Sequence, residues 1–293
     1  MDLENRIVMD NVSKFYGKKQ ALKSVSLSID EGMFGLLGRN GAGKTTLMKI
    51  LATLHGATEG NVKVCGIDIK ERQKIRSITG YLPQDFSMYG NMGAYEAMDY
   101  LGVLSGLKKH ERKERIPELL DKVNLGDNYK TKVKAMSGGM RRRLGIAQAI
   151  LNDPKVLIVD EPTAGLDPEE RVRFRNLLSE IARDRIVILS THIVGDIEAT
   201  CEKVAILDNG AIKYDGTVEN LLNMASGKIF TAEVSRIELE NIKKDYIVTG
   251  MLSRGSHAQV RFVADNKPFE TAEAAEPNVE DAYLYMMNRK EVE

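Results

Sequence analysis

The sequence contains little cysteine and no long apolar run. Its two cysteines, Cys65 and Cys201, are too few for a disulfide scaffold and lack the spacing of a metal site. No apolar stretch near the N-terminus resembles a signal peptide, so we expect a protein of the reducing cytosol. The longest apolar runs, such as residues 156–159 and 186–189, are far shorter than the roughly 18 to 20 residues that cross a bilayer. We therefore expect no membrane-spanning segment in this chain.

An excess of charge of either sign is also missing. Lys and Arg together number 42, as do Asp and Glu, so no overall positive field exists to hold a nucleic acid or an anionic membrane. The basic run at residues 108–115 is interrupted by acidic residues and is typical of a solvated helix face. Charged residues make up 29% of the chain and hydrophobic residues 43%, which excludes disordered and fibrous chains. We expect no nucleic-acid partner.

The 293 residues leave room for one large and one small domain. Alternating apolar and polar residues predict two antiparallel strands, at residues 7–16 and 21–29. The apolar run 33–37 does not alternate, which is typical of a strand buried on both faces. It leads through a glycine-rich loop into a helix predicted at 44–54, with Leu54 on the apolar stripe of that helix.

The remainder of the large domain predicts helices and further buried strands. Residues 91–152 are poor in β-branched residues and carry helical apolar stripes, so we expect an inserted helical layer there. Repetition of strand, helix and strand then predicts an α/β fold, a parallel sheet with helices on both faces. The later strands are predicted at 61–65, 77–82, 155–159, 185–190, 204–207 and 211–214, and a helix is predicted at 169–183.

The residue pattern of the sequence changes after residue 223. Residues 224–227 read Met-Ala-Ser-Gly and suit a linker, and three strand-like runs and a helix follow. We therefore divide the chain into a domain of residues 1–223 and a small α+β accessory domain of residues 224–293. The runs lie at 228–234, 246–252 and 258–264, and the helix lies at 279–288.

Residues 38–45 satisfy the phosphate-loop pattern G-x-x-x-x-G-K-[ST]. Glycines let the backbone wrap closely around phosphate oxygens, and the following helix points its free N–H groups and positive dipole end at the same place. Lys44 adds a positive charge for the outer phosphates, and the Thr45 hydroxyl can ligate Mg²⁺. The predicted nucleotide-binding residues of this segment are Gly38, Arg39, Asn40, Gly41, Ala42, Gly43, Lys44, Thr45 and Thr46.

Two acidic residues follow the strand predicted at 155–159. Because the carboxyl ends of parallel strands meet at one edge of the sheet, Asp160 and Glu161 are expected beside the phosphate loop. Asp160 suits the Mg²⁺ coordination shell, and Glu161 can polarise an attacking water. The alternative is that both acids merely cap the next helix.

The phosphate loop alone fits kinases, GTPases and many ATPases. A GTPase would need the guanine-reading sequence N-K-x-D, and residues 266–269 read Asn-Lys-Pro-Phe without the aspartate. Residues 136–140, Met-Ser-Gly-Gly-Met, resemble the signature motif of ABC-type ATPases, which usually reads Leu-Ser-Gly-Gly-Gln. Methionine at the fifth place resembles the drug-exporter subset of that family. Read alone, the run also fits an ordinary helix N-cap at Ser137.

Other residues match the same family in the expected order along residues 7–223. The resemblance implies that Tyr16 stacks on adenine, although alone it would also fit strand-end packing. It implies that Gln84 senses Mg²⁺ and water and leads to the face that grips a membrane partner, and that His192 contacts the γ-phosphate. Residues 164–167 match the loop that touches the opposing subunit. The implied catalytic residues are Lys44, Gln84, Glu161 and His192, and the implied metal-binding residues are Thr45, Gln84 and Asp160.

The resemblance implies a phosphate-loop NTPase (RecA-like) core with an N-terminal antiparallel β subdomain and a helical insertion. Members of the family pair head to tail, so that ATP on Lys44 of one chain would be closed by Ser137 and Gly139 of the other. Residues 277–284 resemble the end of ATPase subunits from drug- and antibiotic-type exporters, where they would bear on dimer contact or regulation. A helix that simply packs on the small sheet would fit them equally well.

The resemblance therefore implies an ATPase that uses ATP and Mg²⁺ and serves a separately encoded integral membrane permease, with export as the expected direction. Such a subunit would be cytoplasmic and peripheral on the inner face of the cell membrane. One alternative is a soluble ABC-type ATPase that acts on ribosomes or DNA. Another is a nucleotide sensor with inactive sites.

Overall fold

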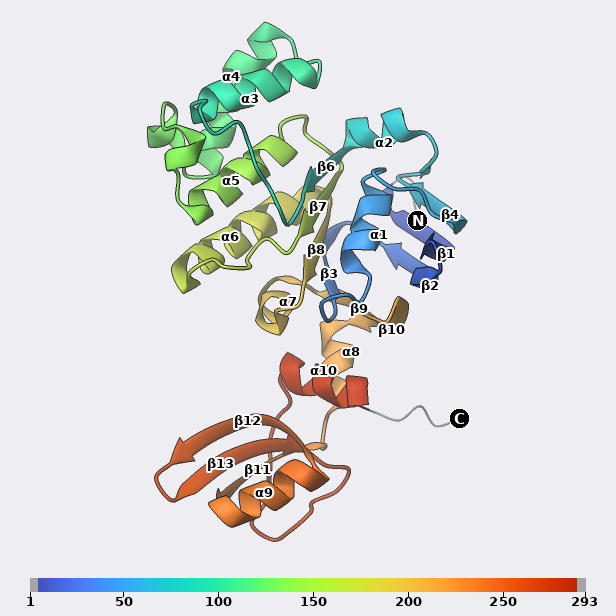
Figure 1. Ribbon diagram of the computed structural model, residues 1–293, viewed down its shortest axis with the longest axis vertical. Helices are drawn as coiled ribbons and strands as arrows, with labels where there is room; N and C mark the ends of the chain where they lie inside the picture. Colours follow the sequence, from blue (N-terminus) through green and yellow to red (C-terminus); the bar gives the residue numbers. More distant parts are fainter. Residues whose placement is uncertain (1–4, 289–293) are drawn as a thin grey trace. The chain divides into compact units, whose positions relative to one another are not determined.

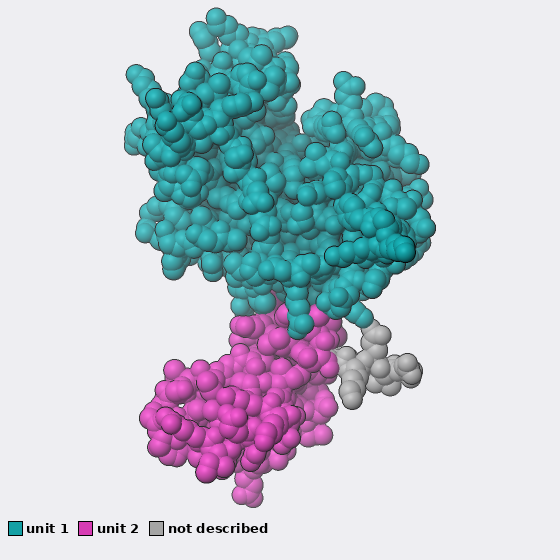
Figure 2. Space-filling model, viewed as in Figure 1, with its two compact units in different colours: residues 1–215 teal, residues 216–293 magenta. Residues whose placement is uncertain are grey.

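The computed structural model describes residues 5–288 and divides into two compact units between residues 215 and 216 (Figure 2). The sequence places a domain boundary eight residues later, at 223/224. In the structure the intervening helix α8 (Val218–Met224) packs against the last helix, α10 (Val279–Asn288), and so it belongs to the second unit.

The first unit begins with a four-stranded sheet in the order β2-β1-β4-β5. The strands predicted at its start are confirmed, because β1 and β2 pair antiparallel with Ile7 opposite Ile29 and Tyr16 opposite Lys19. Their alternation buries one face of the sheet, as it does in β4. The bounds are β1 Ile7–Tyr16, β2 Lys19–Ile29, β4 Glu59–Val64 and β5 Ile67–Asp68.

A six-stranded sheet in the order β10-β9-β3-β8-β7-β6 forms the centre of this unit (Figure 1). The pairs from β9 through β3, β8 and β7 to β6 are parallel, which confirms the predicted α/β fold. Strands β7 and β8 are buried along their whole length, as their unbroken apolar runs require. The bounds are β3 Gly32–Leu37, β6 Thr79–Leu82, β7 Val156–Asp160, β8 Ile186–Thr191, β9 Lys203–Asp208 and β10 Ala211–Thr217.

Helices cover both faces of the central sheet (Figure 1). Helix α1 packs between the central sheet and the antiparallel sheet in one hydrophobic core. Its Leu47 and Ile50 side chains are buried in the cluster that also holds residues of β1, β3 and β8. The insertion at residues 91–152 carries α3, α4 and α5. The bounds are α1 Lys44–Leu51, α2 Arg72–Ile78, α3 Ala94–Leu104, α4 Lys109–Lys122, α5 Gly138–Ala149, α6 Pro168–Ile181 and α7 Val194–Thr200.

Several predicted element boundaries differ from the structure by two or three residues, including those at residues 54 and 77. The helix predicted to reach Leu54 ends at Leu51, because the backbone turns through a left-handed Thr53 (φ +58°), and the Leu54 side chain is 53% exposed. The strand predicted from Ser77 begins only at Thr79, because α2 continues through residue 78 with Ile75 fully buried on its inner side.

The second unit holds a four-stranded antiparallel sheet in the order β12-β13-β11-β14. The three strand runs and the final helix predicted here are confirmed, while helix α9 was not predicted. Leu239 and Ile242 of α9 pack on Phe230, Val260 and Phe262 to form a separate core. The bounds are β11 Ile229–Ser235, α9 Arg236–Asp245, β12 Ile247–Arg254, β13 His257–Val263 and β14 Glu273–Ala274. Across residues 5–288, every helix is too short or too polar to span a bilayer.

The C-terminal run 277–284 is anchored by a buried ion pair. The Arg261 guanidinium donates to Asp281 from Nε at 2.9 Å and from Nη2 at 2.6 Å, and the Asp281 side chain is 1% exposed. Asp281 also accepts from the Asn278 backbone N–H at 2.9 Å, while Asn278 Oδ1 accepts from the Asp281 N–H at 2.8 Å. The motif therefore caps α10 and binds it to β13, which favours the packing interpretation of this run.

Asp281→Asn is expected to loosen the attachment of α10 by about 2 kcal/mol, because the partly buried Arg261 guanidinium would lose its counter-charge. Burial raises the pKa of the Asp281 carboxyl, but hydrogen bonds from Arg261, Asn278 and Thr249 outweigh burial and leave that pKa below its ordinary value. The ion pair is thus fully stabilising above about pH 4 and loses its contribution as pH falls below that value.

Hydrogen exchange of the α10 amides in the full chain measures this effect. At pH 7, exchange should be faster in Asp281→Asn than in the wild type, and below about pH 4 the protection of α10 should depend less on pH in the variant. Glu280→Gln is the matched control, because Glu280 is the exposed neighbouring carboxylate. Equal α10 exchange in Asp281→Asn and the wild type would contradict the assignment.

Candidate nucleotide site

The loop between β3 and α1 has the backbone of a phosphate cradle. Gly43 has φ +114°, a conformation that side chains rarely adopt, and it stands immediately before the first helical residue, Lys44. At Gly38 a Cβ atom would lie 2.3 Å from the carbonyl oxygen of Leu207 in β9. Glycine is therefore required at both positions by the geometry, and the N-terminal N–H groups of α1 face the loop.

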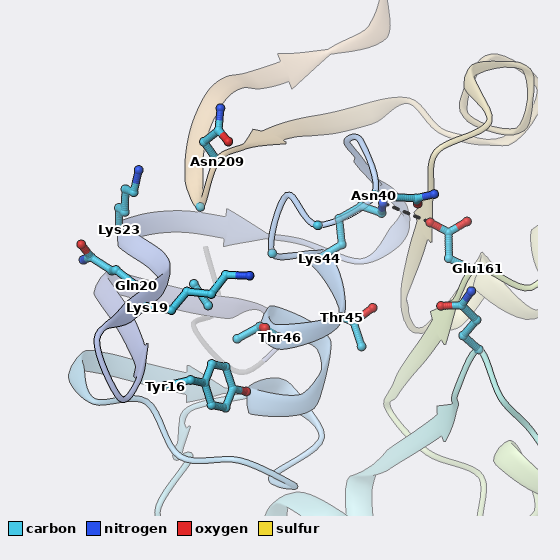
Figure 3. Close-up of a pocket in the computed structure, with 15 residues that line it drawn as sticks. Tyr16, Lys19, Gln20, Lys23, Asn40, Lys44, Thr45, Thr46, Glu161 and Asn209 are labelled. Atoms are coloured by element: carbon cyan, nitrogen blue, oxygen red, sulfur yellow. Dashed lines mark ion pairs between the residues drawn. The ribbon is translucent and has the colours of Figure 1, made fainter.

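The Lys44 ammonium lies at the mouth of this loop and is 5% exposed. It donates to the carbonyl oxygen of Gly38 at 2.7 Å and forms an ion pair with Glu161 Oε1 at 3.1 Å (Figure 3). The lysine thus stands between the phosphate loop and the strand edge that carries the acidic pair. The predicted proximity of Lys44 and Glu161 is found in the structure.

Asp160 and Glu161 occupy different environments although they are neighbours in the chain. Asp160 ends β7 with no exposed surface, and burial raises the pKa of its carboxyl more than the hydroxyls of Ser190 and Thr45 lower it. Glu161 follows with a left-handed backbone (φ +49°), and its N–H donates to the carbonyl oxygen of Ser190 at 2.9 Å. That turn directs the Glu161 side chain toward Lys44.

His192 completes a chain of contacts. Its Nδ1 atom lies 2.7 Å from Glu161 Oε2, so the two carboxylate oxygens of Glu161 contact His192 and Lys44 separately. His192 follows β8, and its side chain is 43% exposed. The parallel order of β3, β8 and β7 brings the three side chains together at one sheet edge.

The residues expected to hold Mg²⁺ fit that ion. Both carboxylate oxygens of Asp160 are buried and accept no hydrogen bond of normal geometry from residues 5–288. The Thr45 hydroxyl lies close enough to Asp160 to lower the pKa of its carboxyl, and Thr45 and Gln84 line one cavity. Within the described chain no group of three His, Cys, Asp or Glu could hold a metal alone. The set therefore suits Mg²⁺, which keeps water and phosphate oxygens among its ligands.

A cavity of about 720 Å³ extends from Lys44 to Tyr16 (Figure 3). Tyr16 is 42% exposed at its far end, and its hydroxyl lies 2.6 Å from His55 Nδ1. The Lys14 ammonium lies 5.2 Å from the centre of the Tyr16 ring. The cavity is lined by Tyr16, Lys19, Gln20, Ala21, Lys23, Asn40, Gly41, Gly43, Lys44, Thr45, Thr46, Gln84, Glu161, Asn209 and Gly210.

Several of these lining residues were not predicted. Lys19, Gln20 and Lys23 come from β2, and Asn209 comes from the turn after β9. In the structure β2 begins at Lys19, two residues before the strand predicted at 21–29, and Lys19 pairs with Tyr16. Nothing local in the sequence places Asn209 beside the phosphate loop.

The signature residues lie apart from this cavity. Ser137 caps α5, with its hydroxyl accepting from the Met140 N–H at 3.1 Å. Gly139 is buried, and a Cβ atom there would meet Glu170 Oε2 at 2.5 Å. Neither Ser137 nor Gly139 is among the residues that line the cavity of the same chain. The structure thus brings together the predicted site residues of the sheet edge but not those of the signature.

Comparison with known proteins identifies similar sequences. A family profile described as ABC transporter matches residues 22–164. The uncharacterized ABC transporter ATP-binding protein YxlF of Bacillus subtilis (strain 168) is 38% identical over 227 residues, which cover 77% of this chain and 76% of YxlF. The linearmycin resistance ATP-binding protein LnrL of the same organism is 36% identical over 221 residues, which cover 74% of this chain and 71% of LnrL.

Among solved structures, one similar fold is a dimer of the ATP-binding cassette MJ0796 in a post-hydrolysis state, bound to ADP and Pi. The match has a TM-score of 0.66 and 27% sequence identity, and it covers 72% of this chain and 98% of that chain.

Proposed function

The chain belongs to the ABC transporter family of ATP-binding subunits, which are ATPases, and we propose that it hydrolyses ATP as half of a head-to-tail homodimer that drives export. The observation that carries the catalytic part of this proposal is the chain of contacts from Lys44 through Glu161 to His192.

In the proposed reaction, the N–H groups of the phosphate loop and Lys44 hold the β- and γ-phosphates. Glu161 orients and polarises the attacking water, and His192 steadies Glu161 and reaches the γ-phosphate. The water oxygen bonds to the γ-phosphorus and its proton passes to Glu161, while the bond from the γ-phosphorus to the β–γ bridging oxygen breaks, which releases ADP and phosphate. Thr45, Gln84 and Asp160 would hold Mg²⁺, which neutralises phosphate charge when bound. Tyr16 would stack on adenine at the far end of the cavity.

The dimer explains why Ser137 and Gly139 lie away from the cavity of their own chain. We propose that the N-terminus of α5 in one subunit, where Ser137 and Gly138 are exposed, closes over the γ-phosphate bound to the other. The γ-phosphate then joins the halves, and its loss lets them separate, a nucleotide-dependent shift between two states. The dimeric state of the similar MJ0796 cassette supports this arrangement.

We also propose that the subunit works at the inner face of the cell membrane with a separate integral membrane permease. Export is favoured by Met140 in the signature and by the similarity to LnrL, which is named for linearmycin resistance. Affinity purification of the tagged chain from its own host should bring down a polytopic membrane protein. Co-purification of ribosomes or DNA instead would favour the soluble alternative, and substrate uptake rather than efflux would reverse the direction.

An apolar face on α3 suits the permease contact. Tyr100, Val103 and Leu104 are 38%, 51% and 65% exposed, and their spacing of three and four places them on one side of the helix. Tyr89, in the segment that follows Gln84, packs edge-on against Tyr100 with ring centres 5.2 Å apart. We propose that this α3 apolar face binds the permease.

The double variant Val103→Asp, Leu104→Asp should lower recovery of the permease at least tenfold while leaving ATP affinity within twofold, because two charges would enter an apolar contact. Val172→Asp is the matched control, since Val172 is a 46% exposed residue of α6. Equal permease recovery with the double variant and the wild type would exclude this surface.

A further inference from the structure

The segment after β7 and the helix after β8 are joined at a second point, away from the cavity. The Thr163 hydroxyl donates to Asp196 Oδ2 in the first turn of α7. Thr163 is 1% exposed and Asp196 is fully buried. The other carboxylate oxygen, Asp196 Oδ1, accepts no hydrogen bond from residues 5–288, and its nearest cation is Arg175 at 3.7 Å.

Burial of a carboxyl group with one oxygen unsatisfied costs free energy relative to a well-packed apolar pair. Stability alone therefore does not account for this contact. A hydrogen bond between two buried side chains has a fixed direction, however, and it holds the two elements that carry it in one relative position.

The Thr163–Asp196 hydrogen bond gives the segments that carry Glu161 and His192 a second contact, besides the one between Glu161 and His192 themselves. Thr163 follows Glu161 by two residues, and Asp196 follows His192 by four. Glu161 Oε2 and His192 Nδ1 meet at 2.7 Å on the cavity side, and Thr163 and Asp196 meet on the buried side. With both contacts present, the Glu161 turn and the His192 turn cannot shift independently.

We propose that Asp196 is a positioning residue for hydrolysis, which holds His192 against Glu161 by binding Thr163. This inference rests on the proposed catalytic roles of Glu161 and His192. Without the Thr163–Asp196 hydrogen bond, the His192 turn is free to move relative to Glu161. A misplacement of about 1 Å in an active site can lower turnover by up to a hundredfold.

Steady-state ATP hydrolysis by the purified full-length chain tests the proposal. Thr163→Val keeps the side-chain shape and removes the donor, so kcat should fall about tenfold while the Kd for ATP stays within twofold. Thr163→Ser keeps a hydroxyl and should restore most of the turnover. Combining Thr163→Val with Asp196→Ala should lower kcat no further than the worse single variant, because the two groups act as one unit.

Thr200→Val is the matched control, because the Thr200 hydroxyl donates to the main-chain oxygen of Asp196 at 2.7 Å within the same helix. It does not join the two segments, and its kcat should stay within twofold of the wild type. In a His192→Ala background, Thr163→Val should cause no further loss, whereas a merely structural role would lower kcat in both backgrounds.

The possible results separate this inference from the proposed function. Normal wild-type turnover with kcat unchanged by Thr163→Val would overturn the positioning role alone. The positioning role would also be overturned if Thr163→Val lowered kcat equally in the wild-type and His192→Ala backgrounds. A wild-type chain that fails to hydrolyse ATP would overturn the proposed function and this inference with it.

Discussion

Glu161→Gln is expected to bind ATP with an affinity within about twofold of the wild type and to lose roughly 10² to 10⁴ in kcat. Glutamine has nearly the same shape as glutamate, so the turn at residue 161 and the packing around it should persist. Its amide cannot take a proton from water, and it carries no charge to polarise the nucleophile. Phosphate release under saturating ATP and Mg²⁺ measures the loss, and direct nucleotide binding measures the affinity.

The same variant reports on the dimer. With hydrolysis blocked and ATP saturating, the γ-phosphate remains in place, and size-exclusion chromatography should show a dimer. Glu169→Gln serves as the control, because Glu169 lies in α6 with its side chain 76% exposed and, within residues 5–288, pairs only with Arg173 in the same helix. Undiminished turnover in Glu161→Gln would remove Glu161 from its catalytic role, and a monomer under these conditions would contradict the head-to-tail pairing.

Lys44→Met should weaken ATP binding itself, with a rise of about a hundredfold in Kd. The Lys44 ammonium is buried at the mouth of the phosphate loop, where a charge-assisted hydrogen bond to phosphate contributes about 1.5 to 3 kcal/mol. Methionine retains most of the length of the side chain but has no charge and no donor.

Isothermal titration with ATP and Mg²⁺ measures this change. Lys49→Met on the same helix is the matched control, and its Kd should stay within twofold of the wild type. An unaltered Kd in Lys44→Met would show that the nucleotide phosphates bind elsewhere. The two variants thus differ in effect, since Glu161→Gln separates hydrolysis from binding and Lys44→Met impairs both.

The order of elements could be predicted because each carries a strong local signal. The run 33–37, the glycines after it and the helix at Lys44 fix the strand, loop and helix of the phosphate site. Some errors lie at element ends, which tertiary contacts determine. Leu54 fits the helical stripe by spacing, yet the left-handed Thr53 ends the helix first.

Helix α9 was missed although its start carries a local signal. Ser235 and Glu238 form a capping box, in which the Ser235 hydroxyl accepts from the Glu238 N–H and Glu238 Oε2 accepts from the Ser235 N–H. Leu239 and Ile242 then supply the buried side. The segment lies between the strand runs 228–234 and 246–252, which are rich in β-branched residues. The strand signal of these runs is stronger than the short helical signal between them.

Candidate site residues could be predicted where they belong to a sequence motif. They could not be predicted where only the tertiary fold brings them to the site. Lys44 and Glu161 belong to motifs, and their contact follows from the parallel sheet edge. Lys19 and Asn209 line the cavity only because β2 and the turn after β9 lie beside α1 in space. Asp196 offers no sequence signal, since its significance depends on burial against Thr163.

The left-handed backbone at Glu161 has a consequence for engineering. A residue other than glycine, asparagine or aspartate is strained in this conformation by about 1 kcal/mol. The glutamate therefore lowers folding stability while its backbone directs the carboxylate toward Lys44. Glycine or asparagine at this position would relieve that strain, but it would leave the buried Lys44 ammonium without its ion-pair partner and abolish turnover. The strain at residue 161 therefore cannot be removed by replacing Glu161 alone, and any programme to stabilise this enzyme should seek substitutions elsewhere and measure turnover at every round.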